Sequence, residues 1–208
     1  MSQSTQIAKL LLEIKAVTLN PSQPYRYTSG LLSPIYCDNR LIISYPDKRR
    51  VVIEAFLNLI RDKNLSFDVV AGTATAGIPH AAWIADRLNK PMVYVRSKSK
   101  AHGKQNQIEG TLRASQTALV VEDLISTGGS AVNAAVALRD ANATVTDCVA
   151  IFTYQLPEAH KAFADVGIRL HALADFTTLI DVATQAGYIN AQEKSQALAW
   201  NADPAKYR

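Results

Sequence analysis

Cysteine is scarce in this sequence, which argues against a zinc-stabilised scaffold. Cys37 and Cys148 are the only two, far apart and outside any C-x-x-C pair. Two cysteines and four scattered histidines lack the ligand spacing of a structural zinc site. We therefore expect two small, buried or half-buried thiols in a reduced cytoplasm, and no dedicated metal site.

Long apolar runs are also absent. No stretch approaches the roughly 20 apolar residues that cross a bilayer, and the first residues lack the positive segment and apolar core of a signal peptide. A chain of 208 residues with 48% hydrophobic and 19% charged residues suits one globular domain with a sizeable core. We expect a cytoplasmic protein without a membrane partner.

Acidic residues are missing from the segment 96–104, which carries Arg96, Lys98, Lys100 and Lys104. The net charge of the chain is +4, from 22 basic and 18 acidic residues, so without these four cations the two signs balance. The excess positive charge therefore belongs to one loop rather than to a broad basic face. This distribution argues against a nucleic acid partner.

Apolar strands alternate with helices through the middle of the sequence. Such strands form a parallel sheet covered on both faces, which binds ligands beyond the carboxyl ends of its strands. The fold class is therefore α/β, with a parallel-sheet core flanked by helices. The strands are expected at 67–71, 91–96, 117–121, 144–152 and 168–173, and the helices between them at 77–89, 129–140 and 157–165.

Further helices are expected outside this core, together with a short strand at 35–37. The predicted helices lie at 6–17 and 47–62 before the core and at 175–186 and 190–200 after it. We expect three segments: N-terminal helices and a small hood at 1–64, the core at 65–174, and C-terminal helices packed on the same unit at 175–208.

The stretch 118–131 contains neither a Walker loop nor a G-x-G-x-x-G fingerprint. It starts as a buried strand, turns polar at Glu122 and Asp123, passes through hydroxyls and the paired glycines Gly128 and Gly129, and enters a helix. Small residues let backbone N–H groups approach an anion, and the helix directs its positive end at that anion. The two acids, expected where the strand stops, could hold ribose hydroxyls or a metal. The alternative is an ordinary strand–turn–helix corner with two solvated acids.

Two further loops leave the same predicted edge of the sheet. At 71–79, a glycine-flanked turn with hydroxyls can offer N–H groups to an anion such as pyrophosphate, and an ordinary turn is the alternative. The basic loop 96–104 suits a highly charged substrate that has to be covered during reaction, and a solvated surface loop is its alternative. A single histidine would usually be incidental, but His102 is a candidate site residue because it lies close to Lys100 in this loop.

The stretch 118–131 resembles the motif of the type I phosphoribosyltransferases. The run 27–36, the triplet 38–40 and the pattern Arg-x-x-x-Lys-x-His-Gly at 96–103 resemble the orotate-specific members. The resemblance spans roughly residues 11–173 and implies the type I fold with a small N-terminal hood. The implied reaction transfers ribose 5-phosphate from phosphoribosyl pyrophosphate to N1 of orotate, giving orotidine 5′-monophosphate and pyrophosphate for UMP synthesis.

The resemblance also implies roles for individual residues. Glu122 and Asp123 would hold the ribose hydroxyls and balance the developing cation, and Lys100 and His102 would complete the catalytic set. Magnesium would bridge substrate oxygens without a protein cage, and the basic loop would reach into the partner's site of a homodimer. The implied substrate-binding residues are Thr73, Ala74, Arg96, Lys100, His102, Glu122, Asp123, Leu124, Ile125, Ser126, Thr127, Gly128, Gly129 and Ser130.

Anchoring of orotate departs from the family pattern. Thr28, Leu32 and Ala76 stand where many members carry lysine, and no arginine for the orotate carboxylate occurs near 152–155. The residues that we assign to orotate instead are Ser126, Tyr36 and Arg40, with the backbone amides at 35–37 as an alternative to Arg40.

Two other functions compete with this interpretation. A phosphoribosyltransferase for a purine or xanthine shares the 118–131 motif, and the run 27–36 argues against it. A regulator that senses phosphoribosyl pyrophosphate without catalysis would add a DNA-binding helix-turn-helix or a broad basic face. Neither feature is recognisable in the sequence.

Overall fold

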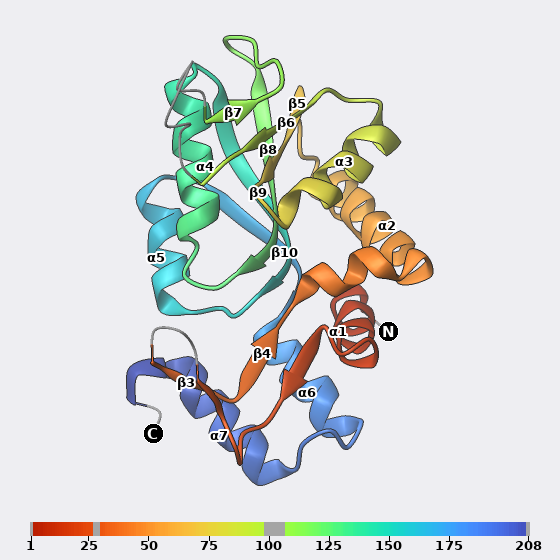
Figure 1. Cartoon of the computed structure of the whole chain (residues 1–208), viewed down its shortest axis with the longest axis vertical. Helices are drawn as coiled ribbons and strands as arrows, with labels where there is room; N and C mark the ends of the chain where they lie inside the picture. Colours follow the sequence, from red (N-terminus) through yellow and green to blue (C-terminus); the bar gives the residue numbers. More distant parts are fainter. Residues whose placement is uncertain (1, 27–29, 98–106, 207–208) are drawn as a thin grey trace.

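The centre of the molecule is a six-stranded sheet, seen in a computed structural model that describes residues 2–26, 30–97 and 107–206. The strand order is β10-β9-β8-β5-β6-β7, and every neighbouring pair is parallel except β6 and β7 (Figure 1). The expected parallel sheet is therefore confirmed, with a short antiparallel strand at one edge. The strands are β5 (Val69–Thr73), β6 (Met92–Val95), β7 (Ile108–Glu109), β8 (Thr117–Ile125), β9 (Thr144–Thr153) and β10 (Arg169–Asp175).

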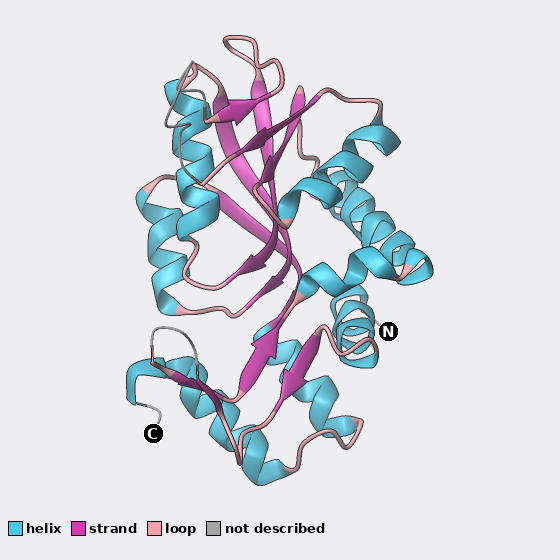
Figure 2. Ribbon diagram, viewed as in Figure 1, coloured by secondary structure: helices cyan, strands magenta, loops and turns pink. Residues whose placement is uncertain are grey.

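Helices cover both faces of this sheet, as Figure 2 shows. One face packs against α1 (Gln3–Glu13), α2 (Pro46–Asp62) and α3 (Gly77–Leu88), and the other against α4 (Gly129–Asp140) and α5 (Pro157–Asp165). Successive residues of β8 alternate between the two resulting cores, because strand side chains alternate in direction. Leu119 and Val121 belong to the first core, and Ala118 and Val120 to the second.

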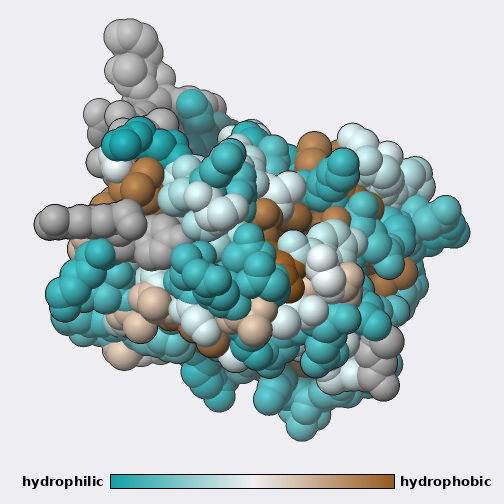
Figure 3. Space-filling model, turned by 90° about the horizontal axis from the view of Figure 1, so that it is seen from below, coloured by the Kyte–Doolittle hydropathy of each residue, from teal (hydrophilic) through white to brown (hydrophobic). Residues whose placement is uncertain are grey.

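A smaller lobe, the hood, lies below the sheet in Figure 1 and is built from both ends of the chain. The Trp200 indole Nε1 donates to the Leu32 carbonyl oxygen at 3.0 Å, and α1 packs against α6. Seen from below, the surface is mostly hydrophilic, with hydrophobic residues scattered between (Figure 3). The elements of the hood are β1 (Val17–Leu19) paired with β4 (Ile35–Cys37), β2 (Tyr25–Arg26) paired with β3 (Leu32–Ser33), η1 (Asn39–Ser44), α6 (Phe176–Gln185), α7 (Ala191–Ala202) and η2 (Pro204–Lys206).

Most predicted elements are present, and the bounds of several differ; the strand predicted at 67–71, for example, is β5 at Val69–Thr73. The predicted helix 6–17 begins earlier and ends at Glu13, since Lys15 turns the chain with a φ of 56° and Val17 already belongs to β1. The strand predicted at 117–121 continues to Ile125, so Glu122 and Asp123 lie inside it rather than at its end. Within the described ranges, no helix is long and apolar enough to span a membrane.

Candidate active site

The glycine turn (126–130) connects β8 to α4 and borders a cavity of about 340 Å³. Gly128 precedes the helix with a φ of 82°, and a Cβ there would lie 2.9 Å from the Phe163 ring. Gly129 faces open space, with no heavy atom within 4 Å of where its Cβ would be. The first N–H groups of a helix lack partners within it, so this end of α4 can bind an anion. The lining residues are Glu122, Leu124, Ile125, Ser126, Thr127, Gly128, Gly129, Ser130, Ala131 and Asn133.

The acidic pair, Glu122 and Asp123, lies next to this turn, with Glu122 buried and Asp123 partly buried. Glu122 is 5% exposed, and its Oε1 accepts a hydrogen bond from the Asp123 backbone N–H at 3.0 Å. Burial, with the hydrogen bond and charge of Asp123, raises the pKa of Glu122 to about 9. Burial also raises the pKa of Asp123. Both carboxyl groups therefore hold their protons more tightly than solvated acids do, unlike the acids of the alternative interpretation. A nearby cation would favour their negatively charged form.

The second turn follows β5 and lies directly beside β8. Thr73 is buried at the end of β5, a cis peptide joins Ala74 to Thr75, and Gly77 begins α3. A Cβ on Gly77 would overlap the Val121 carbonyl oxygen. Glycine is thus required where α3 meets the backbone of β8, and this close approach brings the second turn against the acidic pair.

Arg96 follows β6 and borders a second, smaller cavity of about 50 Å³. Its guanidinium lies 3.5 Å from Glu109 Oε1, and its carbonyl oxygen accepts from the Gln107 side chain at 2.8 Å. The cavity also contacts Thr73 and Ala74 of the second turn and Ser130 of the glycine turn. The predicted catalytic residues Lys100 and His102 lie outside the described residues.

On the hood side, a cavity of about 310 Å³ is bordered by Cys37, Asp38 and Arg40 and by the acidic pair. Arg40 borders it and binds Asp38 through two hydrogen bonds, Nε to Oδ1 at 2.6 Å and Nη2 to Oδ2 at 2.9 Å. This pairing lowers the pKa of Asp38. Tyr36 is half-exposed beside Tyr25, with ring centroids 5.8 Å apart, and does not itself line the cavity. The structure thus brings Arg40 to the acidic pair but places Tyr36 farther out.

These three cavities form one cleft, because Ser130 borders all of them and Ala74 borders two. The cleft brings together residues from the two predicted turns with Arg96 and Ser97, the described start of the predicted basic loop. It also contains the side chains of Cys37, Asp38, Gln107 and Asn133, to which we assigned no role. Asp38 carried a signal as part of the triplet 38–40, and Asn133 carried one because it follows Gly129 by four residues and therefore lies one helical turn above it.

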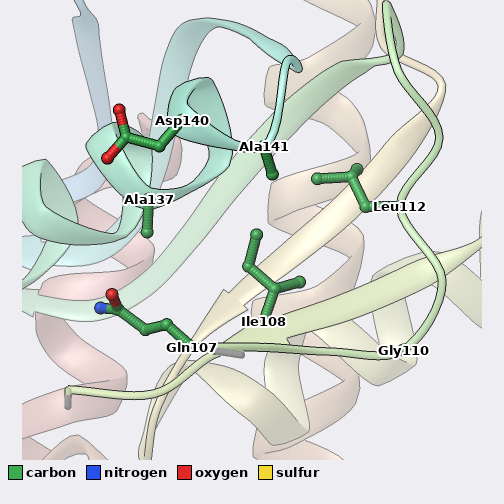
Figure 4. A pocket seen from close by; sticks show the side chains of 7 residues that line it. All are labelled: Gln107, Ile108, Gly110, Leu112, Ala137, Asp140 and Ala141. Carbon is green, nitrogen blue, oxygen red and sulfur yellow. The ribbon is translucent and has the colours of Figure 1, made fainter. Parts of the chain in front are cut away.

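A separate cavity of about 380 Å³ opens between the end of α4 and the segment around β7 (Figure 4). Ile108, Leu112 and Ala141 are directed at the space between them, and Asp140 is the one charged side chain among the described residues that line it. The cavity shares Gln107 with the cleft. Among the described residues, its lining has one acid and no cation, so it offers little for a phosphorylated substrate.

The buried carboxyl group of Glu122 makes the free energy of unfolding depend on pH. From about pH 4.5 to about 9, the unfolded chain has released the Glu122 proton and the folded chain still holds it. The folded state binds more protons there, so its free energy of unfolding falls as the pH rises, by at most about 1.4 kcal/mol per pH unit. Urea unfolding at several pH values should give a flatter dependence for Glu122→Gln than for the parent. An equal pH dependence of the free energy of unfolding in the two proteins would contradict the raised pKa of Glu122.

Comparison with known proteins places the chain and its fold in one class, the phosphoribosyl transferases. The phosphoribosyl transferase domain matches residues 44–171, more than half of the chain. Over 208 residues, the whole of both chains, the sequence is 67% identical to the orotate phosphoribosyltransferase of Coxiella burnetii. It is 52% identical over 199 residues to that of Halalkalibacterium halodurans, covering 96% of this chain and 95% of the relative.

Solved structures agree with the sequence relatives. The crystal structure of orotate phosphoribosyltransferase from Aeropyrum pernix superimposes with a TM-score of 0.76 at 29% identity, covering 88% of this chain and 99% of that chain. The chain therefore belongs to the orotate phosphoribosyltransferases. Both the family and the type I fold expected from the sequence are confirmed.

Proposed function

We propose that the cleft transfers ribose 5-phosphate from phosphoribosyl pyrophosphate to N1 of orotate, releasing pyrophosphate. The observation that carries the proposal is the acidic pair, with Glu122 buried and Asp123 partly buried, between two helix-starting turns, one on each side. A sugar carrying phosphate at one end and pyrophosphate at the other needs two anion sites with hydroxyl acceptors between them. The two turns, with the acidic pair between them, support this assignment.

The acidic pair would act on the sugar itself. Carboxylates of Glu122 and Asp123 can accept hydrogen bonds from the 2′ and 3′ hydroxyls of ribose. As the bond to pyrophosphate breaks, the ring gains oxocarbenium character, as in other glycosyl transfers. Negative charge in a buried site stabilises this developing cation more than it stabilises the neutral sugar. N1 of orotate then bonds to C1′ from the opposite side of the ring.

The two turns would hold the charged ends of the substrate. Residues Ser126 to Ser130 would bind the 5′-phosphate through backbone N–H and hydroxyl groups at the start of α4. Thr73 and Ala74 would contact the pyrophosphate, and Arg96 would neutralise it. Lys100 and His102 remain predicted partners of the leaving pyrophosphate.

Magnesium fits this site as a companion of the substrate. Among the described residues, no group of three or more histidine, cysteine, aspartate or glutamate side chains is arranged to hold a metal ion. Mg²⁺ prefers oxygen ligands and keeps several waters, so the pyrophosphate and ribose oxygens would supply most of its ligands. When bound, it would offset the negative charge of the leaving group.

We extend three expectations to this chain as part of the proposal. Its active form is a homodimer whose basic loop completes the partner's site. It works in the cytoplasm, in keeping with its two free thiols, Cys37 and Cys148. Its chain has three segments: N-terminal helices with strands of the hood at 1–64, the core at 65–174, and C-terminal helices packed on the same unit at 175–208.

A panel of bases tests the function directly. With phosphoribosyl pyrophosphate and magnesium present, the ultraviolet absorbance of orotate should fall as it is consumed, and a chelator should stop the change. Adenine, guanine, hypoxanthine and xanthine should give no product. Turnover of a purine instead would assign a different base, and no turnover of any base would favour the regulator.

Arg40 provides a narrower prediction. Arg40→Ala should raise the KM for orotate and leave the KM for phosphoribosyl pyrophosphate nearly unchanged, since the guanidinium borders the hood side of the cleft. The expected loss is about 1.5–3 kcal/mol, the range for a hydrogen bond to a charged group. An unchanged KM for orotate would assign its carboxylate to the backbone amides at 35–37.

A further inference from the structure

Asn39 joins the hood to the strand that carries the acidic pair. It is 1% exposed at the first position of η1, and its Nδ2 donates to the Asp123 carbonyl oxygen at 2.7 Å. Pairing of β8 with β5 ends at Val121, while pairing with β9 continues to Ile125. A backbone carbonyl that is shielded from water needs a hydrogen-bond donor. Since β5 no longer pairs with β8 beyond Val121, the Asn39 side chain donates to the Asp123 carbonyl oxygen instead.

Cys37 orients the Asn39 amide. The Cys37 Sγ–H donates to Asn39 Oδ1 at 3.3 Å. Burial, with the charges of Asp123 and Asp38, raises the pKa of the thiol, so it remains a donor at neutral pH. With a donor facing its oxygen and an acceptor facing its nitrogen, the amide has one favourable orientation. The chain of contacts therefore runs from β4 through Cys37 and Asn39 to Asp123.

We propose that Asn39, held by Cys37, is a positioning residue that fixes Asp123 against the hood. The same cavity of about 310 Å³ is bordered by Cys37, Asp38 and Arg40 on one side and by the acidic pair on the other. The Asn39 bridge would set the distance between the base, on the hood side, and the ribose, on the β8 side. This inference rests on the proposed function, because the distance matters only if two substrates react across the cavity.

Steady-state kinetics on the complete protein test the proposal. Asn39→Ala should lower kcat by about 10- to 100-fold, the effect of a small misplacement of reacting groups, with little change in either KM. Cys37→Ser keeps a donor to Oδ1 and should retain most of the parental kcat, whereas Cys37→Ala should lose part of it. The matched control is Asn201→Ala, because the Asn201 amide likewise donates to a distant backbone carbonyl, that of Tyr154. It should lower the melting temperature without lowering kcat.

Each outcome is decisive. A parental kcat in a folded Asn39→Ala protein with a lowered melting temperature would overturn the proposal, because the bridge would then be purely structural. If Asn39→Ala does not fold, the Cys37 variants decide, and equal kcat values for Cys37→Ser and Cys37→Ala would overturn it. The parent's own consumption of orotate, measured alongside, tests the proposed function separately.

Discussion

Replacing Asp123 by asparagine is expected to lower kcat by about 10²- to 10³-fold, the effect of removing one preorganised electrostatic group. Asparagine has nearly the same size and leaves the backbone hydrogen bonds to Glu122 and Asn39 in place. It removes the negative charge that the transition state uses most, since positive charge on the ribose is largest there. The KM for phosphoribosyl pyrophosphate should therefore change far less than kcat.

Steady-state kinetics and calorimetric binding of phosphoribosyl pyrophosphate separate the two effects. Asp140→Asn is the matched control, since Asp140 borders the separate cavity at the end of α4 and should leave both constants unchanged. Equal losses in binding and turnover for Asp123→Asn would show that the carboxylate contributes uniform binding rather than transition-state stabilisation.

Substituting Gly77 by alanine should destabilise the protein by about 3 kcal/mol, near the upper end of the cost of overpacking. The new Cβ would overlap the Val121 carbonyl oxygen, and a backbone atom in the central strand cannot move aside as a side-chain end can. The start of α3 would have to shift away from β8, and the second turn would move with it. Activity should fall together with stability.

Gly129→Ala provides the contrasting case at the start of α4. Its Cβ would meet no protein atom within 4 Å, so the free energy of unfolding should be unchanged or slightly raised. The methyl group would nevertheless occupy space at the edge of the 340 Å³ cavity and weaken phosphate binding. Urea unfolding and steady-state kinetics, measured on both glycine variants, test these two predictions. A stable Gly77→Ala protein, or unaltered binding in Gly129→Ala, would contradict this account of the two turns.

The core of the fold could be predicted because its signals are local. The helices at 129–140 and 157–165 were predicted to the residue, since glycine or proline marks their starts and their apolar faces repeat regularly. The start of β8 was predicted correctly, but its end was not, because acids in a strand resemble a strand end. They are tolerated because Glu122 and Asp123 face a cleft. The strand β7 escaped prediction because two residues show no periodicity.

The candidate site was predictable where one motif contained it, and not where the fold assembles it. The acidic pair and the glycine turn are adjacent in sequence, so their spacing alone indicated phosphate and ribose binding. Asn39 lies 84 positions from its partner Asp123, and nothing in the sequence connects the two. Arg40 was found through resemblance, and its pairing with Asp38 emerged only from the structure.

The most direct test of the central claim is a crystal structure of the protein soaked with ribose 5-phosphate. The account predicts the phosphate at the glycine turn 126–130, against the start of α4, with the ribose 2′ and 3′ hydroxyls on Glu122 and Asp123. Clear density for the sugar phosphate elsewhere, with this cavity empty, would contradict it.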